Sequence, residues 1–498
     1  MQYETVIGLE VHVQLDTRSK MFCACPADYQ TADPNTPTCP VCLGLPGALP
    51  VINRRAVEFT MMTGLALNCS IPEYAKFDRK NYPYPDLMKG YQISQYDLPL
   101  ALDGYVEIDG DPSIGHTQRR IGVERVHLEE DVAKMQHFPD GDGGEGYSLV
   151  DVNRSGVPLM EIVSKPDLRS PEEAHQYLTS LHSLVQFLGV STANMQDGNF
   201  RCDANVSIRP VGSDTFGTRT EIKNVNSFRS VFQALEFEVE RQQRVVESGG
   251  QVVQETRGWV EEREVTVSQR SKEYAHDYRY FPEPDLPPLN IGRDWVTQLQ
   301  ASLPELAPQR KARFIADYGL SEYDADLLTN TRATADYFEA ALSIRDVDRS
   351  PDTALDSAKE VANWILGDLS RLLNQDHRDI AASPVTPTGL SDLLRLIADG
   401  TLSISLAKTV LEEMYASGGD AAAIVEEKGL AQISDTSAIE AAVAEAIAAN
   451  PKAVADYLDG KENAARFLMG QVMRITKGQA QPDLALRLVQ EGLAAQKN

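Results

Sequence analysis

The chain contains 498 residues, of which 42% are hydrophobic and 24% charged, and its formal net charge is −26. This acidic balance argues against a broad basic surface for nucleic acid, although a local basic patch is compatible with it. Six cysteines in a chain of this length make no disulfide framework, and no segment approaches the roughly 18 apolar residues of a membrane span. The N-terminus lacks the features of a signal peptide, so we expect a soluble, cytoplasmic protein without membrane contacts.

The distribution of strand and helix signals predicts an α+β chain with about three domains. Alternating strand patterns dominate residues 1–293, in which we expect a mainly antiparallel sheet with helices. The proline-rich stretch 278–289 cannot be a helix interior and marks the end of this domain. From Trp295 onward the pattern is helical, and a further break divides it into a helical domain, 294–402, and a small helical tail, 403–498.

The first strand signal, residues 7–15, alternates strictly between two faces. Its odd positions are all apolar, whereas Gly8, Glu10, His12 and Gln14 share the other face. Glu10 and His12 are therefore neighbours roughly 7 Å apart along the strand, and their side chains can converge on one cation. Taken alone, such a pair is more typical of a solvated strand face.

Four of the six cysteines are clustered as two close pairs, Cys23-x-Cys25 and Cys39-x-x-Cys42. Four thiolates with this spacing predict a zinc knuckle, in which a structural Zn²⁺ is held tetrahedrally. Reduced structural thiols are the alternative. A redox pair is less favoured, because glycine and proline follow the second pair in place of a helix.

The alternation of apolar and polar residues recurs in four later segments. Their polar faces carry His127, Glu129 and Asp131; Asp151 and Asn153; Arg201, Asp203, Asn205 and Ser207; and Glu221 and Lys223. Several such faces together predict one polar cavity over a sheet. Carboxylates, amides and a single imidazole suit Mg²⁺, and interspersed Arg and Lys suit phosphates. Because no Gly-x4-Gly-Lys-Ser/Thr motif occurs, we expect nucleotide-phosphate chemistry without a P-loop.

Two helices of the first domain have clear start and stop signals. Ser170, followed by Pro171 and Glu173, forms a capping box. The other helix begins at Ser227 and stops at Gly249. Both carry apolar stripes at helical spacing, so we expect core helices without chemistry.

The tail changes charge along its length. Residues 401–460 hold ten acidic side chains against three basic ones, whereas the remainder is mainly basic. Arg466, Gly470, Arg474 and Lys477 fall at helical spacing and form one basic stripe. Gly470 costs about 1 kcal/mol of helix stability relative to Ala, but it allows an RNA backbone to approach closely. The stripe therefore predicts an RNA contact, with a solvated helix face as the alternative.

Motifs spread over nearly the whole chain resemble one known family, the B subunits of aspartyl/glutamyl-tRNA amidotransferases, called the GatB family. The matching segments are Glu4–Gln14, Lys76–Asp86, Gly90–Asp97, His127–Asp131, Asp151–Arg154, Arg201–Asn205, Glu221–Phe228 and Asp277–Asp285. Near the C-terminus, Gly470–Gly478 resembles the tail shared with YqeY-like proteins. Two departures from the family pattern, Pro83 and Val132-Ala133, touch none of the expected ligands.

The resemblance implies a cradle-like kinase and transamidase domain over 1–293 and a YqeY-like, tRNA-binding tail over 403–498. It implies an ATP-dependent carbon–nitrogen ligase with glutamine as the amide donor. ATP would phosphorylate the side-chain carboxylate of Asp or Glu misacylated on tRNA(Asn) or tRNA(Gln), and ammonia would then displace phosphate. This order makes chemical sense, because an acyl phosphate supplies the leaving group that a carboxylate lacks, and Mg²⁺ neutralises the transferring group. The sequence does not decide between the two tRNAs.

The matching motifs also imply roles for single residues. Glu10, His12 and Glu129 would form the core of the Mg²⁺ site, with Glu130, Asp131 and Glu161 as weaker candidates. Lys80 and Lys89 would line the route of ammonia. The candidate contacts to the nucleotide or to the acceptor end of tRNA are Arg79, Asn81, Arg154, Arg201, Asp203, Asn205, Lys223 and Asn224. Structural ion pairing is an equal alternative for each of these.

No glutaminase motif is found in the chain, so ammonia has to come from a partner. By resemblance, the partners are an amidase-family A subunit and a small C subunit in a heterotrimer, with a cognate aminoacyl-tRNA synthetase as a further candidate. Two other functions compete with this hypothesis: a metal-dependent RNA hydrolase that uses Glu10, His12 and Glu129, and a non-catalytic tRNA-binding scaffold. ATP consumption that depends on misacylated tRNA separates the three.

Overall fold

The computed structural model describes residues 2–138, 146–271, 278–345, 351–432, 436–459 and 461–495. Asp277, the first residue of the 277–285 motif, lies outside them. The chain divides into two compact units, Met1–Leu306 and Ala307–Asn498. Within the described ranges, no helix is long and apolar enough to cross a membrane.

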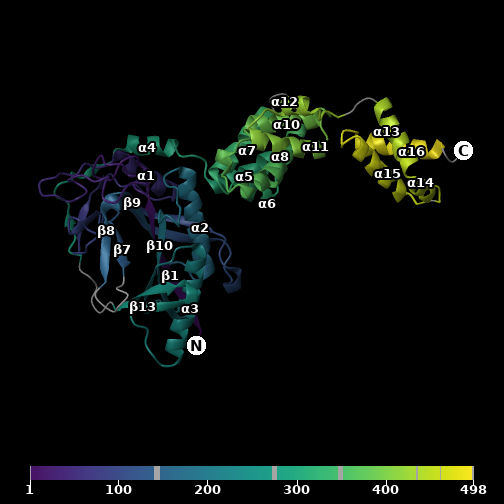
Figure 1. The fold of residues 1–498 in the computed structure, drawn as a ribbon. Helices are drawn as coiled ribbons and strands as arrows, with labels where there is room; N and C mark the ends of the chain where they lie inside the picture. Colours follow the sequence, from purple (N-terminus) through teal and green to yellow (C-terminus); the bar gives the residue numbers. More distant parts are fainter. Residues whose placement is uncertain are drawn as a thin grey trace. The chain divides into compact units, whose positions relative to one another are not determined.

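An eight-stranded sheet forms the centre of the first unit and confirms the predicted α+β class (Figure 1). The strand order is β13-β12-β11-β10-β1-β9-β6-β5, and neighbours are antiparallel except for β11 and β12. The strands are β1 (Tyr3–Gln14), β5 (Ala101–Ile108), β6 (Arg119–Glu130), β9 (Pro158–Ser164), β10 (Phe200–Pro210), β11 (Thr220–Lys223), β12 (Glu255–Val260) and β13 (Val265–Ser271). The first strand of the chain therefore becomes a central strand of the sheet.

Three smaller sheets accompany the large one. They pair β3 (Asp78–Asn81) with β4 (Tyr91–Ser94) and β14 (Phe281–Pro282), β2 (Tyr74–Ala75) with β15 (Leu289–Asn290), and β7 (Lys134–Phe138) with β8 (Tyr147–Asp151). Because β14 and β15 pair with β3 and β2, the proline-rich stretch 278–289 runs back along residues from the first hundred of the chain.

Helices cover the apolar face of the large sheet. They are α1 (Arg54–Ala66), α2 (Pro171–Leu188) and α3 (Phe228–Glu247), and Figure 1 shows α2 and α3 along one side of the sheet. Val11 and Val206 from the strands, with Leu178 and Leu235 from the helices, are fully buried in one core. α2 and α3 are thus core helices, as predicted, and the opposite face of the sheet is left for polar side chains.

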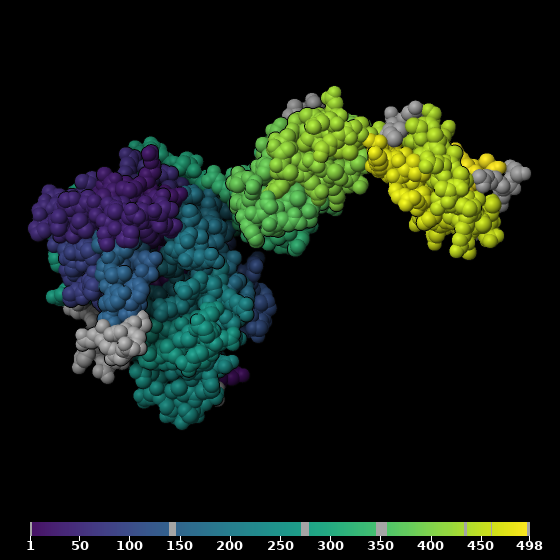
Figure 2. Space-filling view, viewed as in Figure 1, coloured from purple at the N-terminus to yellow at the C-terminus, as the bar shows by residue number. Residues whose placement is uncertain are grey.

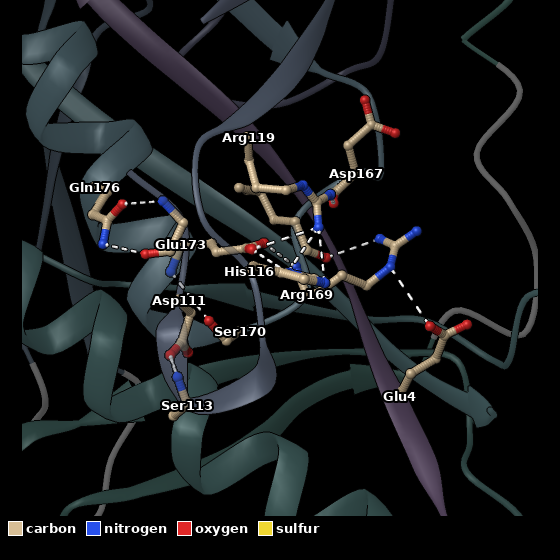
Figure 3. A network of polar contacts seen from close by, with 12 residues as sticks. Glu4, Asp111, Ser113, His116, Arg119, Asp167, Arg169, Ser170, Glu173 and Gln176 are labelled. Carbon is tan, nitrogen blue, oxygen red and sulfur yellow. Dashed lines mark hydrogen bonds and ion pairs between the residues drawn. The ribbon is translucent and has the colours of Figure 1, made fainter. Parts of the chain in front are cut away.

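The N-terminus of α2 is fixed by a buried polar network (Figure 3). Ser170 Oγ accepts the Glu173 N–H at 3.2 Å, and the Glu173 carboxylate accepts the Arg169 N–H at 2.8 Å. The predicted capping box is therefore present, except that the carboxylate binds the N–H of the residue before the N-cap in place of the N-cap itself. Glu173 also lies 2.6 Å from His116 Nδ1 and 3.6 Å from Arg119 Nη1. These contacts tie α2 to the connection between β5 and β6.

The first unit ends later than the sequence predicted. α4 (Arg293–Ala301) follows the expected boundary at 293, yet Leu299 is buried in the core of the first unit and Leu303 and Leu306 pack against it. The helical pattern from Trp295 marks where the secondary structure changes. The boundary of the unit lies later, because the apolar side chains of α4 are buried in the core of the first unit.

The second unit is entirely helical in its described residues and contains two separate cores. Its helices are α5 (Ala307–Tyr318), α6 (Glu322–Leu328), α7 (Arg332–Arg345), α8 (Pro351–Trp364), α9 (Ser370–Gln375), α10 (Pro387–Ala398), α11 (Ile404–Ser417), α12 (Ala421–Lys428), α13 (Thr436–Ala449), α14 (Pro451–Leu458), α15 (Asn463–Ile475) and α16 (Pro482–Ala495). One core runs from Phe314 to Val425 and the other from Ile439 to Leu493. The structure therefore differs from the predicted division at 402/403, because Val410 and Leu411 of α11 are buried with α10.

Candidate active site

The polar face of the large sheet gathers side chains that are far apart in sequence. Strand register places Arg201 opposite His12, His12 opposite Glu161, and Glu161 opposite His127, which makes one row across β10, β1, β9 and β6. Glu129 follows His127 on the same face of β6, because side chains alternate along a strand. The expected polar face thus has a definite centre at His12.

His12, Glu129 and Glu161 form a compact group of possible metal ligands, whose ligand atoms all lie within 4.8 Å of one another. His12 Nε2 is 3.6 Å from Glu161 Oε2 and 3.9 Å from Glu129 Oε1. Both carboxylates are buried. The structure thus brings together His12 and Glu129, two of the three predicted core ligands, with Glu161, one of the weaker candidates, and their role as metal ligands stays a prediction.

Glu10 lies beside this group and outside it. Its Oε1 accepts the Asn205 side-chain amide at 3.0 Å. Burial raises the pKa of Glu10, and the nearby Glu161 raises it further. Glu10 is therefore a neighbour of the group and not one of its members. A cation bound nearby would favour the ionised form of its carboxyl.

Alternation placed His127 on a polar strand face without assigning it a role, and its side chain is buried against the same carboxylates. Its Nε2 is 3.3 Å from Glu161 Oε2 and 4.0 Å from Glu129 Oε2, and its Nδ1 has no hydrogen-bond partner among the described residues. Burial alone would raise the pKa of Glu161, but His127 and His12 hold it below its ordinary range. The alternation that selected Glu129 also placed His127 on the polar face and could have found it.

Lys80 brings a cation to the carboxylates. Its Nζ lies 5.1 Å from the ring centre of Tyr278 and 6.0 Å from that of Tyr82. Burial alone would lower the pKa of Lys80, but Glu129 foremost raises it above its ordinary value, so the side chain stays charged. Ser94 Oγ donates to Glu129 Oε2 at 3.3 Å and fixes that carboxylate from another side.

Two weaker metal candidates, Glu130 and Asp131, have other partners. Glu130 points to the opposite side of β6 from Glu129, where its Oε1 lies 2.6 Å from Lys89 Nζ and accepts the Ile93 N–H at 3.0 Å. Asp131 accepts hydrogen bonds from Gln14 at 2.6 Å and Arg201 at 3.0 Å. Alternation along the strand places Glu130 outside the His12–Glu129–Glu161 group, and Asp131 is already paired with Arg201.

The four clustered cysteines also come together, with their sulfur atoms within 4.8 Å of one another. Cys39 Sγ and Cys42 Sγ are 3.9 Å apart, close to the roughly 3.8 Å that a tetrahedron with Zn–S bonds of about 2.3 Å requires. The Cys39 N–H donates to Cys42 Sγ at 3.1 Å, a bond that suits a thiolate. The sulfur atoms therefore fit zinc.

Figure 2 shows N-terminal residues, in purple, over a broad part of the surface of the first unit.

Comparisons with known proteins match both units. The model of the GatB/GatE catalytic domain matches residues 5–297, and that of the GatB domain matches 352–493. The B subunit of the aspartyl/glutamyl-tRNA(Asn/Gln) amidotransferase of Dehalococcoides mccartyi strain CBDB1 is 56% identical over 494 residues, which cover 99% of each chain. The protein of that name from Moorella thermoacetica is 55% identical over 493 residues, which cover 99% of this chain and all of the relative.

This chain belongs to the GatB family. The assignment rests on the full length of both proteins, and it agrees with the resemblance seen in the motifs.

Three of the basic and amide residues expected to contact substrate in this GatB-family chain instead hold the protein together. Arg79 makes a two-pronged pair with the buried Glu283 at 2.7 and 2.8 Å. Asn81 donates to the Arg279 carbonyl at 2.9 Å, and Arg154 donates to the Val132 carbonyl at 2.9 Å. For these three positions the structure favours the alternative of structural pairing.

The remaining substrate candidates lie on the polar face of β10 and β11 or next to it. Lys223 Nζ contacts Asp203 at 2.6 Å. Asp203 and Glu221 raise the pKa of Lys223 although its burial would lower it. The side chains of Arg201 and Lys223 are 36% and 40% exposed, so both cations, although paired with Asp131 and Asp203, are open to a ligand on this face. Asn224 is exposed and has a positive φ of 63°.

In the GatB-domain region, the predicted basic stripe is exposed on and just beyond α15. Arg466, Gly470 and Arg474 lie along the exposed side of that helix, and Lys477 follows its end. Leu468 and Val472 are buried on the packed side. A Cβ at Gly470 would meet no atom within 4 Å, so the glycine leaves an open surface there.

Proposed function

We propose that this chain is the subunit of a glutamine-dependent tRNA amidotransferase that activates and amidates misacylated tRNA. The observation that carries the proposal is the buried His12–Glu129–Glu161 group with Lys80 beside it. The names of the relatives support this activity, and the lack of a P-loop is compatible with a nucleotide held by a metal and by basic side chains.

His12, Glu129 and Glu161 would hold Mg²⁺, which when bound would neutralise the negative charge of the phosphoryl group in transfer. The distances of 3.6 and 3.9 Å from His12 to the two carboxylates leave room for a cation between them. His127 lies 3.3 Å from Glu161 and would orient it, and Ser94, which donates to Glu129, would do the same for that carboxylate. Glu10 would serve as a nearby charge rather than as a central ligand.

The cations of the polar face would bind the anionic groups of the reaction. Lys80 is kept charged by its carboxylate neighbours and is placed to attract an acyl phosphate. Arg201 and Lys223 are half-exposed along β10 and β11, where they would contact phosphates of ATP or of the acceptor end. Asp203, Asn205 and Asn224 lie among them and would add hydrogen bonds.

The route of ammonia is proposed to pass Lys89 and Lys80, the two lysines that the resemblance places along it. A cavity of about 100 Å³ lies beside the Lys89–Glu130 pair and reaches Cys42 and Gly156. Glu129 and Glu130 are adjacent on β6 but face opposite sides, so this cavity and the metal group lie on the two sides of one strand. Ammonia released by an amidase-family A subunit would enter here, and a small C subunit would complete the heterotrimer.

The other parts of the proposal concern stability and tRNA. The four cysteines would hold a structural Zn²⁺, since all four are present and no reacting group lies among them. The stripe Arg466, Gly470, Arg474 and Lys477 would contact the tRNA backbone. We place the protein in the cytoplasm, and a cognate aminoacyl-tRNA synthetase is a candidate supplier of its substrate.

The test is a transamidation assay of the chain reconstituted with its A and C subunits. Asp-tRNA(Asn) and Glu-tRNA(Gln) are supplied separately with ATP and glutamine, and Asn-tRNA, Gln-tRNA and ADP are measured. We expect ADP formation that depends on a misacylated tRNA and matches the amide formed. RNA cleavage without ATP would favour a hydrolase, and the absence of both reactions would favour a scaffold.

A further inference from the structure

Lys20 is a buried cation without a hydrogen-bond partner. Its side chain is 0% exposed, and among the described residues its Nζ has no hydrogen-bond partner. Burying an ammonium without a hydrogen bond or an anion costs several kcal/mol, so such groups are rare unless something compensates them. We therefore expect an anionic group close to Lys20.

The zinc knuckle lies next to this side chain. The Lys20 N–H donates to the Cys25 carbonyl at 2.9 Å, which fixes its backbone to the first cysteine pair. A Cβ built at Gly156 would lie 3.6 Å from Lys20 Cδ, 3.7 Å from Cys42 Cβ and 3.9 Å from Glu130 Oε2. Lys20, Cys42 and Glu130 thus converge on one glycine.

Glu130 pairs with Lys89, and among the described residues it forms no ion pair with Lys20 within 4.0 Å. Its carboxylate is held by Lys89 at 2.6 Å and by the Ile93 N–H at 3.0 Å. The cysteine sulfurs are the other potential anions beside Lys20, because its backbone is bonded to Cys25 and its side chain shares the space at Gly156 with Cys42.

A zinc ion bound by four cysteines carries excess negative charge, because four thiolates outweigh the two charges of Zn²⁺. In a partly buried site this excess is costly unless a cation or N–H donors offset it. Without zinc and with protonated thiols, Lys20 would instead be a buried cation among neutral groups. The same side chain would favour the metal-bound form and disfavour the metal-free form.

We propose that Lys20 is the charge-compensating partner of the zinc–thiolate site and that it increases the affinity of the knuckle for zinc. This inference rests on the proposed zinc site. It assigns a role to a residue that belongs to neither cysteine pair.

The test compares zinc binding by the full-length chain and by Lys20→Met, which removes the charge and keeps the length of the side chain. Zinc affinity is measured by competition with a chromophoric chelator, and zinc content by elemental analysis. Partners that orient or compensate metal ligands typically change affinity 10–100-fold, so we expect a loss of about that size. Lys165→Met, which removes a partly exposed lysine paired with Asp103, should leave zinc affinity unchanged.

A second measurement separates this role from a general effect on folding. Thermal unfolding of the zinc-free proteins should show Lys20→Met to be as stable as the parent chain or more stable, because the buried charge is gone. Lys20→Gln, which keeps N–H donors without the charge, should bind zinc with intermediate affinity. It also serves as the reporter if the methionine variant fails to fold.

The outcomes distinguish the two proposals. A parent chain that binds no zinc, or a Cys42→Ser variant that binds it as tightly as the parent, overturns the zinc site and this inference with it. One zinc bound per chain with equal affinity in the parent, Lys20→Met and Lys20→Gln overturns the role of Lys20 alone.

Discussion

His127 and Glu161 lie opposite each other on neighbouring strands, with Nε2 and Oε2 3.3 Å apart, and both side chains are buried. Glu161 in turn faces His12 on its other side at 3.6 Å. A carboxylate held between two imidazoles has little freedom to turn. The geometry of the proposed metal site therefore depends on His127, which is not one of the three proposed ligands.

Replacing His127 with Leu should weaken metal binding more than it weakens the chemistry. We expect the Mg²⁺ concentration for half-maximal amidation to rise about 10–100-fold, because Glu161 loses the donor that orients it. His127→Gln retains an N–H donor and should recover part of the loss. An unchanged Mg²⁺ dependence in the leucine variant would show that Glu161 is positioned without His127.

Glu129→Gln should stop amide formation and leave the partner's glutaminase active. The substitution keeps the shape of the side chain and removes the negative charge that would bind the cation, so we expect a loss of at least about 10²-fold in amidation. Glu124→Gln on the same strand is the matched control, since Glu124 is half-exposed and pairs only with Arg125 at 3.0 Å among the ion pairs of the described residues. Normal amidation by the Glu129 variant would remove this residue from the metal site.

Lys89 and Glu130 provide a test of the ammonia route that does not involve the metal. Lys89→Met leaves a buried carboxylate unpaired, so it is combined with Glu130→Gln to avoid that cost. The double variant should lose glutamine-dependent amidation by about tenfold or more and retain amidation driven by added ammonium salts, in keeping with a pair that controls passage rather than chemistry. Equal losses with both nitrogen donors would place the pair in the chemical step instead.

From the sequence, the face on which a side chain lies could be predicted better than the neighbouring strand with which its own strand pairs. Alternation placed His12 and Glu129 on polar faces, and the sheet confirms both. Glu161 carried no such signal, because every residue of β9 is buried and the strand does not alternate between polar and apolar. Glu161 joins His12 and Glu129 only because β9 pairs with β1 in a register that sets Glu161 opposite His12, and register depends on the whole sheet.

Substrate contacts and boundaries were harder to predict for a related reason. Arg79 and Arg201 are both arginines within matching motifs, but Arg79 is bound by Glu283, which is more than 200 residues away in sequence, while Arg201 remains half-exposed. Local patterns cannot reveal such distant partners. In the same way, α4 was assigned to the helical domain by its periodicity, although Leu299 is buried with the sheet.

Glu173 offers a prediction about stability without any effect on chemistry. Glu173→Gln removes the charge shared by His116 and Arg119, and we expect the first unit to lose about 1–3 kcal/mol of stability. The loss should appear as faster hydrogen exchange in α2 and a lower urea midpoint for the first unit. Glu172→Gln, one residue earlier on the same helix and partly exposed, should change stability by no more than about 0.5 kcal/mol.

The basic stripe of α15 should affect the binding of tRNA and not the turnover of bound substrate. Arg466→Gln combined with Arg474→Gln removes two exposed cations on one side of the helix, so we expect the KM for misacylated tRNA to rise several-fold with little change in kcat. The dependence of tRNA affinity on salt should also become shallower, by about one unit of slope for each phosphate that is no longer neutralised. Arg487→Gln on α16 removes a cation that is equally exposed but weakly paired with Glu491 at 3.9 Å, and it serves as the control. If the double variant and this control have the same KM and the same salt dependence, the stripe is a solvated helix face, and the tRNA contacts of the chain must come from other residues.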